Sequence, residues 1–314
     1  MAKVYLSGED YICANSNVFI YGSGATENVT ILDDVYNVTI YNTVESVTLS
    51  RSKSSYVINK GFSGEDVYLD NKLVCKTSTI DVTIKFSGVD LRAYTNGVDN
   101  QSTTNSCTAF AVTTMMEIYN YKLTGIDKSY SALFNYYTSR TIHNQSGVIE
   151  DVGSRIYKAV QAIKLYGIVE EKDYPYDIGK VNDVPPLEVW EIGRNNKPDF
   201  EFIQILNSGD IVEAPFVKEV LDDGLAIAFT LTIGREFYEL ANKKLEEMNY
   251  VGIDNISQVD SNHAMCIVGY DDNLNGGSFI VENSWGKEWG DNGFLALKYD
   301  VLNKNASAIY YIKD

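Results

Sequence analysis

The first part of the chain alternates apolar and polar residues in short segments at a fixed spacing. Four segments, residues 28–31, 37–40, 46–49 and 55–58, begin nine residues apart. Such alternation is typical of half-buried strands, and the Asn, Asp and Ser residues between the segments favour turns. The pattern predicts a small β-rich repeat domain over residues 1–86, folded either as a stacked solenoid or as a meander.

This repeat lacks the Gly-Gly-x-Gly-x-Asp loops of calcium-binding nonapeptide repeats. Asp33 and Asp34 are therefore predicted to be turn residues and not calcium ligands. A stack of short strands would offer a flat, polar face, which is suited to docking on a protein or a cell envelope. The alternative to such a docking role is a domain that only covers apolar surface on the rest of the chain.

Beyond residue 86 the apolar positions change to helical spacing and later to strand-like runs. A first helical face contains Ala109, Val112, Met115, Met116, Tyr119 and Leu123, and a second contains Ile156, Ala159, Val160, Ile163 and Leu165. Apolar runs over 225–231, 264–268 and 279–281 follow. Helices followed by strands predict a two-lobed α+β domain over residues 87–314, with Met115 and Met116 in its core.

Composition narrows the classes of function. With 314 residues the chain is long enough for two domains, and its net charge of −17 argues against nucleic acid as a partner, because phosphate binding needs a basic face. Its four cysteines, Cys13, Cys75, Cys107 and Cys266, form no CxxC pair, so no metal and no cofactor are expected.

Localisation is only loosely constrained by the sequence. The N-terminus has no apolar signal region, and no apolar run is long enough to cross a bilayer. We therefore expect a soluble chain without a membrane span. It would be cytoplasmic as written, or secreted or on the cell surface if a signal has been removed.

A lone cysteine follows a polar stretch and precedes an apolar helix, in the sequence NQSTTNSCTAF. If Ser106 caps that helix, Cys107 lies in the first turn, where unpaired N–H groups and the helix dipole favour a thiolate. A thiolate is the reactive form of cysteine. A small buried cysteine at a helix start is the structural alternative.

The chain has two histidines that could act as a base. His143 lies in the polar segment RTIHNQSG, whereas His263 begins the apolar strand SNHAMCIVGYDD, where a core histidine is the alternative. Asn283 stands twenty residues later and is followed by two Trp-Gly pairs. An Asn can hold an imidazole in one tautomer, and Trp285 can shield that bond from water. The order Cys, His, Asn indicates a thiol protease.

These motifs resemble the papain family of cysteine peptidases, and more narrowly its bacterial and archaeal members that lack the helical propeptide. The resemblance covers residues 89–314 and rests on DLRAYTNGVDNQSTTNSCTAFA, DVGSRIYKAVQAIKLYGIVEEKDYPYD, NHAMCIVGYDD and ENSWGKEWGDNGF. It implies a papain-like catalytic domain with a helical lobe and a β-barrel-like lobe. It also implies hydrolysis of peptide bonds in a peptide or protein substrate.

The resemblance assigns a role to each matching residue. Cys107 would be the thiolate nucleophile, His263 its imidazolium partner, Asn283 the residue that orients the ring, and Gln101 a side-chain donor of the oxyanion hole. On the substrate-binding side, the family match implies Gly153 and Ser154 as the cleft wall and Trp285 as the shield over the His–Asn bond.

The chain departs from the family pattern around these positions. Asn105 replaces a glycine, Thr104 stands where many relatives have a disulfide cysteine, and Thr108 replaces a tryptophan. Ser154 replaces the second glycine of a pair, so a side chain enters the cleft wall. The preference of the side-chain pockets therefore does not follow from the family.

Two other functions are compatible with the sequence. A thioester formed on Cys107 could be passed to an amine, as in a transpeptidase or ligase. A non-catalytic binding protein would be favoured by loss of Cys107, His263 or Asn283, and all three are present. Inhibitory propeptides of the family resemble helical modules, so the β-rich repeat predicts a permanent accessory domain.

Overall fold

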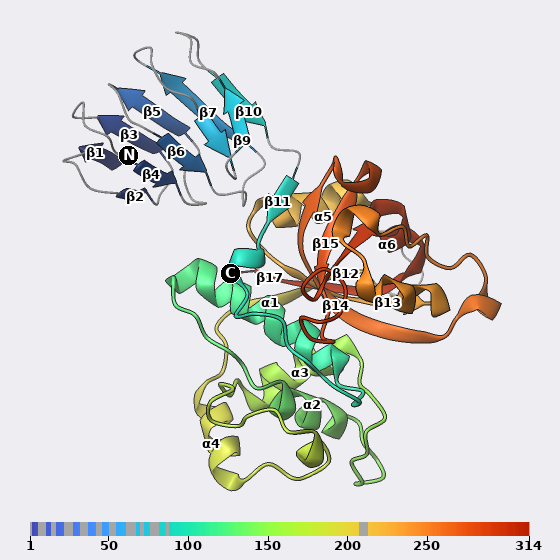
Figure 1. Ribbon diagram of the computed structural model, residues 1–314. Coiled ribbons are helices and arrows are strands. Elements are labelled where there is room, and N and C mark those ends of the chain that lie inside the picture. Colours follow the sequence, from blue (N-terminus) through green and yellow to red (C-terminus); the bar gives the residue numbers. More distant parts are fainter. Residues whose placement is uncertain are drawn as a thin grey trace. The chain divides into compact units, whose positions relative to one another are not determined.

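The computed structural model describes residues 88–206 and 213–313 and, earlier in the chain, ten short strands by their backbone (Figure 1). The chain divides into two compact units, Met1–Asp90 and Leu91–Asp314. The positions expected to be turns in the repeat, Asp33 and Asp34, lie outside the described residues.

The first ten strands of unit 1 form two five-stranded sheets. The strands are β1 (Ala2–Tyr5), β2 (Tyr11–Cys13), β3 (Asn17–Tyr21), β4 (Asn28–Ile31), β5 (Asn37–Tyr41), β6 (Ser46–Leu49), β7 (Ser55–Lys60), β8 (Val67–Leu69), β9 (Lys72–Cys75), β10 (Val82–Lys85) and β11 (Gly88–Asp90). One sheet has the order β1-β3-β5-β7-β10 and the other β2-β4-β6-β8-β9. β4 and β6 pair in parallel with Asn28 opposite Ser46, two nine-residue repeats apart. The last pair of each sheet, β7 with β10 and β8 with β9, is antiparallel, and the other pairs are parallel.

Unit 2 has an α+β fold. Its helices are α1 (Cys107–Thr124), α2 (Ala132–Thr141), α3 (Ile156–Tyr166), α4 (Leu187–Asn195), α5 (Ala214–Asp222) and α6 (Tyr299–Asn305). Its strands are β12 (Glu201–Leu206), β13 (Ile227–Ile233), β14 (Ser261–Asp271), β15 (Ser278–Glu282), β16 (Phe294–Lys298) and β17 (Ala306–Lys313). These strands pair antiparallel in the order β12-β17-β13-β14-β15-β16.

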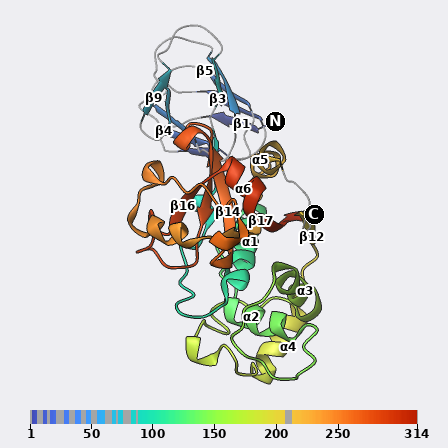
Figure 2. The same ribbon diagram turned by 90° about the vertical axis from the view of Figure 1, so that its right-hand side faces the viewer.

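The central helix α1 separates the helices from the sheet. It contacts β13 and β14 on one side and α2 and α3 on the other, as both ribbon views show (Figures 1 and 2). Residues 108–119 are all buried, and the Met115 and Met116 side chains are 1% and 2% exposed, so their predicted place in the core is confirmed. A helix buried on all sides can carry the nucleophile at its first residue on a rigid support.

Two of the predicted apolar positions are wrong. Leu123 is 64% exposed, because α1 leaves the core in its last turn, just before the left-handed Gly125 ends it. Leu165 is 55% exposed. It follows Ile163 by two residues and therefore lies on the opposite side of α3, whose inner face is formed by Ile156, Ala159, Val160 and Ile163.

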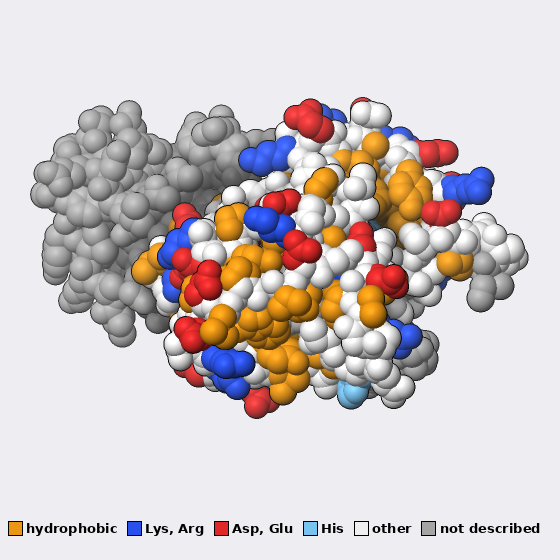
Figure 3. Space-filling view, turned by 90° about the horizontal axis from the view of Figure 1, so that it is seen from below, with side chains coloured by type: hydrophobic (Ala, Val, Ile, Leu, Met, Phe, Trp, Pro, Cys, Tyr) orange, Lys and Arg blue, Asp and Glu red, His pale blue; other side chains and the backbone are white. Residues whose placement is uncertain are grey.

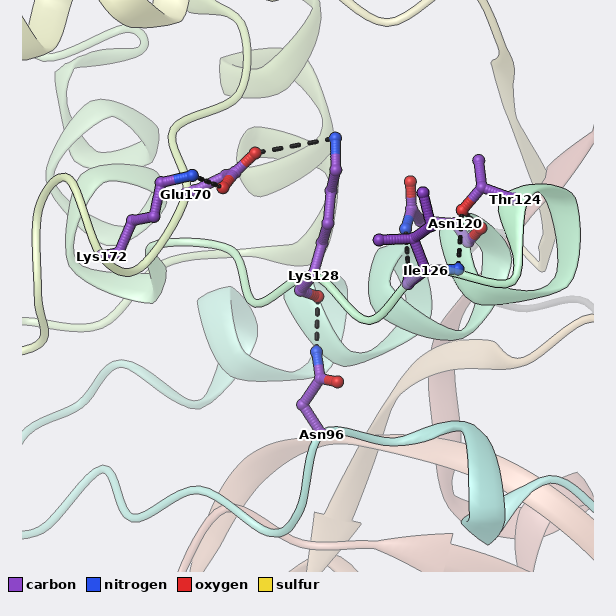
Figure 4. A network of polar contacts seen from close by, with 7 residues as sticks. All are labelled: Asn96, Asn120, Thr124, Ile126, Lys128, Glu170 and Lys172. Atoms are coloured by element: carbon purple, nitrogen blue, oxygen red, sulfur yellow. Dashed lines mark hydrogen bonds and ion pairs between the residues drawn. The ribbon is translucent and has the colours of Figure 1, made fainter.

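A polar network ties the segment before α1 to two later loops (Figure 4). The Asn96 side-chain amide donates to the carbonyl of Lys128, whose ammonium lies 3.6 Å from a carboxylate oxygen of Glu170. Glu170 also pairs with Lys172, and this hydrogen bond lowers the pKa of Glu170. Because these ion pairs are exposed to water, they position the loops more than they stabilise the fold.

The surface of unit 2 mixes charge and apolar area. Seen from below, hydrophobic side chains form a band among acidic and basic side chains (Figure 3). In the part of the chain that the structure describes, no helix is long and apolar enough to span a bilayer.

Candidate active site

Cys107 is the first residue of α1 and is half-buried at the side of a cleft of about 1020 Å³. Arg155 and the α3 residues Ile156, Tyr157, Val160, Gln161 and Lys164 form one wall of this cleft. Residues of β12, β13, β14 and β17 form the other. The predicted position of the cysteine at a helix start, beside an open cleft, is therefore confirmed.

Ser106 occupies the N-cap position, but its side chain does not cap α1. Its hydroxyl instead lies 2.7 Å from the Thr104 hydroxyl and 2.7 Å from the Tyr176 hydroxyl. The Tyr176 hydroxyl also donates to the carbonyl of Gln101 at 3.2 Å. These contacts between hydroxyl groups hold the loop that precedes Cys107. Thr104, which stands at the position of a cysteine in many relatives, takes part in them. Sequence analysis assigned no role to Tyr176, although it lies in the quoted motif that ends at Asp177, because the motif does not show which residues its hydroxyl contacts.

Two effects oppose each other at the Cys107 thiol. Burial raises the pKa of Cys107, although backbone hydrogen bonds from Ala264, Thr108 and Cys107 itself oppose that shift. The loss of water around the sulfur outweighs the helix end. Burial in the folded protein therefore favours the thiol form of Cys107, and a base that accepts its proton would make it a nucleophile.

His263, Asn283 and Trp285 form a compact group at the ends of β14 and β15. The antiparallel pairing of these strands, with Cys266 opposite Glu282, brings the two termini together. His263 Nε2 lies 2.7 Å from Asn283 Oδ1, and both side chains are buried. The Trp285 ring stacks on the imidazole at a centroid distance of 4.6 Å. The structure thus brings the predicted base, orienting amide and shield into contact.

Asn283 determines which imidazole nitrogen can act as a base. Its Oδ1 also accepts a hydrogen bond from the Ser284 backbone N–H at 2.8 Å, so it faces His263 as an acceptor. Nε2 then carries the proton, and Nδ1 is the nitrogen that can receive another. Burial lowers the pKa of His263 to about 4, with the Asn283 hydrogen bond opposing that shift. In the described residues no hydrogen bond joins His263 to Cys107.

Gln101 is buried and held at three points. Its backbone N–H donates to the Ser284 carbonyl at 2.8 Å, and its Oε1 accepts from the Ser284 hydroxyl at 2.6 Å. Its Nε2 donates one hydrogen to the Thr104 carbonyl at 2.6 Å. The second Nε2 hydrogen is left for a ligand. Ser284 fixes this amide and lies in the ENSWGKEWGDNGF motif, but the sequence assigned no role to it.

Trp285 belongs to a larger aromatic cluster that sequence reasoning also missed. The Tyr238 ring stacks on it nearly in parallel at 5.6 Å, and Phe237 and Trp289 contact it edge to face. The Tyr238 hydroxyl donates to Asp260 at 3.0 Å. The cluster shields one face of the imidazole and extends to the surface at Tyr238, which is 43% exposed.

Of the two residues predicted for the cleft wall, Ser154 lines the cleft beside Cys107, whereas Gly153 is not among its lining residues. Gly153 has a φ of +80°, which favours glycine, and its N–H donates to the Tyr136 hydroxyl at 3.1 Å. The Asp151 carboxylate bonds both that hydroxyl and the Asn105 N–H, so the wall is linked to the nucleophile loop. His143 lies apart, in an exposed loop as predicted.

Four carboxyl groups, Asp99, Glu117, Glu171 and Glu282, are coupled behind the site. Burial raises the pKa of each, to about 8 for Glu282 and about 7 for Glu171, and Asp99 adds repulsion to the other three. Glu282 is 4% exposed and directly precedes Asn283. Their protonated forms are therefore the ones that the fold accommodates.

These carboxyls predict that stability falls as pH rises. The folded protein keeps protons on Glu282 and Glu171 that the unfolded chain loses above about pH 4.5, so unfolding releases protons up to about pH 8. The lowered pKa of His263 has the opposite effect, since it makes the free energy of unfolding rise with pH, but only below about pH 6.5, the pKa of an unfolded histidine. Between pH 6.5 and 8, ionisation of Glu282 alone should lower the free energy of unfolding by about 2 kcal/mol, and this loss is measurable as a falling Tm.

Glu282→Gln supplies the control for this expectation, since it removes the titrating group. The slope of Tm against pH should become shallower in Glu282→Gln and stay unchanged in Glu188→Gln, which alters an exposed carboxyl. An equal slope in the wild type and in Glu282→Gln would show that the buried cluster does not set the pH dependence.

An antiparallel sheet packed on a central helix, with a cysteine at the helix start and a buried His–Asn pair, defines a cysteine protease of the papain type. A model of the papain family of cysteine proteases matches residues 86–311. The chain belongs to this family and is a cysteine-type peptidase. In the described residues no group of three or more His, Cys, Asp or Glu could hold a metal ion.

Similar proteins come from several sources. An uncharacterized peptidase C1-like protein of Acanthamoeba polyphaga mimivirus is 30% identical over 228 residues, which are 68% of this chain and 68% of that protein. Cysteine protease XCP2 of Arabidopsis thaliana is 27% identical over 225 residues, 67% of this chain and 56% of that protein. The crystal structure of xylellain, a cysteine protease from Xylella fastidiosa, covers 72% of this chain and 85% of its own, with a TM-score of 0.60 and 22% identity, and supports the fold.

Proposed function

We propose that the protein hydrolyses peptide bonds with Cys107 as nucleophile, His263 as base and acid, Asn283 as orienting residue and Gln101 in the oxyanion hole. The observation that carries this proposal is the 2.7 Å contact between His263 and Asn283 under the Trp285 ring, beside a cleft that begins at Cys107. Packing alone does not explain this pair, since burying two polar side chains costs free energy that apolar side chains at the same positions would not.

The chemistry starts from neutral side chains. Cys107 passes its proton to His263 Nδ1 as the sulfur attacks the scissile carbonyl, so that charge develops only with substrate in the cleft. The free Nε2 hydrogen of Gln101 and the backbone N–H of Cys107 stabilise the oxyanion. The imidazolium then protonates the departing amine, and water hydrolyses the thioester on Cys107.

Gln101→Ala should lower kcat by about 100- to 1,000-fold with little change in KM, because the lost donor acts on the oxyanion of the transition state. Steady-state hydrolysis of a fluorogenic peptide measures both constants. Gln145→Ala is the matched control, since it removes the same amide from an exposed loop. A rise in KM with unchanged kcat would place Gln101 in substrate binding instead.

Transfer of the thioester to an amine is the second candidate function. The two outcomes differ in their products, because water gives a free carboxylate and an amine gives a new amide. We propose hydrolysis, since the matching family model and the similar plant protein are both described as cysteine proteases. Mass spectrometry of the products with an added amine tests this directly, and a dominant amide product would favour a transpeptidase or ligase.

We propose that residues 1–86 form a β-solenoid accessory domain and residues 87–314 the catalytic domain. The parallel pairing of alternate strands from β1 to β8 supports a repeat domain that differs from a helical inhibitory propeptide. It would dock on a protein or cell-envelope partner. The finer resemblance to bacterial and archaeal members remains a prediction, because the two relatives compared by sequence come from a virus and a plant.

Removal of the first 86 residues tests the accessory role. A chain that begins at Ser87 should hydrolyse a small fluorogenic peptide with a kcat/KM within about threefold of the full chain, since an accessory domain does not occupy the cleft. Strong activation on removal, or self-cleavage near that junction as activity appears, would identify an inhibitory segment instead.

A further inference from the structure

The charged residues of the cleft have one sign. The described residues that line it include two cations, Arg155 and Lys164, and neither Asp nor Glu. The whole chain, in contrast, carries a net charge of −17. Both cations are exposed, and among the described residues neither has an ion-pair partner. A basic cleft in an acidic protein indicates a preference among substrates.

Two hydroxyl groups in the same cleft have no hydrogen-bond partner among the described residues. Thr108 is 3% exposed, and its Oγ1 is buried and unpaired one residue after the nucleophile. The Ser154 hydroxyl, on the cleft wall, is likewise buried and unpaired. An ionised carboxylate only accepts hydrogen bonds, so donors of this kind and nearby cations suit it together.

The cleft follows the length of α3. Arg155 precedes the helix and Lys164 lies in its last turn, so the two are separated by about 13 Å along the axis at 1.5 Å per residue. Tyr157, Val160 and Gln161 line the wall between them. An extended peptide covers this length with about four residues. The two cations can therefore act on different positions of one bound peptide.

The position of the base indicates which part of the substrate, before or after the scissile bond, lies in this cleft. His263 protonates the leaving amine, and Trp285 and Tyr238 lie beside it but do not line the cleft. The part of the substrate that becomes the thioester thus lies along α3.

We propose that this cleft selects peptides with an Asp or Glu side chain within the four residues before the scissile bond. This inference rests on the proposed peptidase function and names its substrate class. Lys164 or Arg155 supplies the countercharge for the carboxylate, and the Ser154 and Thr108 hydroxyls are available as hydrogen-bond donors. Such ion pairs at a partly solvated site should favour Glu over Gln by about three- to tenfold.

Binding to Cys107→Ala protein tests the selection without requiring catalysis. Fluorescent peptides would carry Glu, Gln or Lys at one of the four positions before the scissile bond and be otherwise identical. At one or more positions, anisotropy should give a Kd for the Glu peptide about three- to tenfold below that for the Gln peptide, with Lys weakest. Equal Kd values at all four positions, or a preference for Lys, would overturn the inference.

Charge reversal on α3 identifies the residues responsible. In the Cys107→Ala background, Lys164→Glu or Arg155→Glu should abolish or reverse the preference for Glu. Lys158→Glu makes the same change on a helix position that does not line the cleft, and should keep it. An equal loss of the preference in all three variants would show that it depends on the net charge of the protein and not on the two cleft cations, and would overturn the assignment.

The two proposals fail in different ways. Selective binding of Glu peptides without hydrolysis by the wild type would overturn the peptidase function and leave the acidic selection standing. Hydrolysis by the wild type together with equal binding of Glu and Gln peptides would overturn only the selection.

Discussion

Cys107→Ala should lower kcat/KM for peptide hydrolysis by at least about 10,000-fold, because the proposed mechanism forms its thioester on Cys107. The fold should persist, since Cys107 is half-buried at the edge of the cleft and the rest of α1 keeps its packing. A fluorogenic peptide assay, with circular dichroism as a check on folding, measures the effect.

Cys266→Ala is the matched control. Cys266 is a free cysteine in the buried part of β14, where burial raises its thiol pKa well above the usual range. Its loss removes a small buried side chain and should leave peptide hydrolysis within a few-fold of the wild type. Comparable loss of activity in both variants, with folding intact, would contradict the role of Cys107.

His263→Ala should lower kcat by about 100- to 10,000-fold, because the neutral thiol of Cys107 then has no base. The pH dependence separates this role from a structural one. The wild type should show a bell-shaped profile whose limbs belong to the coupled Cys–His pair. The variant should show a rate that rises steadily with pH, as the thiol ionises unaided.

His143→Ala controls for this substitution, because it removes the other histidine from an exposed loop. It should retain both the rate and the bell-shaped profile. A bell-shaped profile in His263→Ala would show that another group titrates as the base.

The catalytic motifs could be predicted from the sequence because each is local and chemically distinctive. A cysteine at a helix start, a histidine at a strand start and an asparagine before Trp-Gly identify themselves by their neighbours. The α+β order of unit 2 followed from apolar spacing. Helix phase was less certain, as Leu165 shows, since one residue of error places a side chain on the opposite face.

The supporting contacts could not be predicted, because they join residues far apart in the chain. The Tyr176 hydroxyl reaches Ser106 across 70 positions, and Ser284 reaches Gln101 across 183. The effect of burial on the pKa of Cys107 could not be predicted either, since the helix start is visible in a sequence but the loss of water around a side chain is not. Only the fold places Glu282 and Asp99 together.

The most direct test of the central claim is to trap the covalent intermediate. A short peptide ester would be mixed with the protein, quenched in acid within a second and digested, and the acylated residue identified by mass spectrometry. Our account predicts one thioester, on Cys107, that is absent from Cys107→Ala. Acylation of Cys13, Cys75 or Cys266 would contradict it. So would hydrolysis of the ester by the Cys107→Ala protein, in which no acyl-enzyme can form on residue 107.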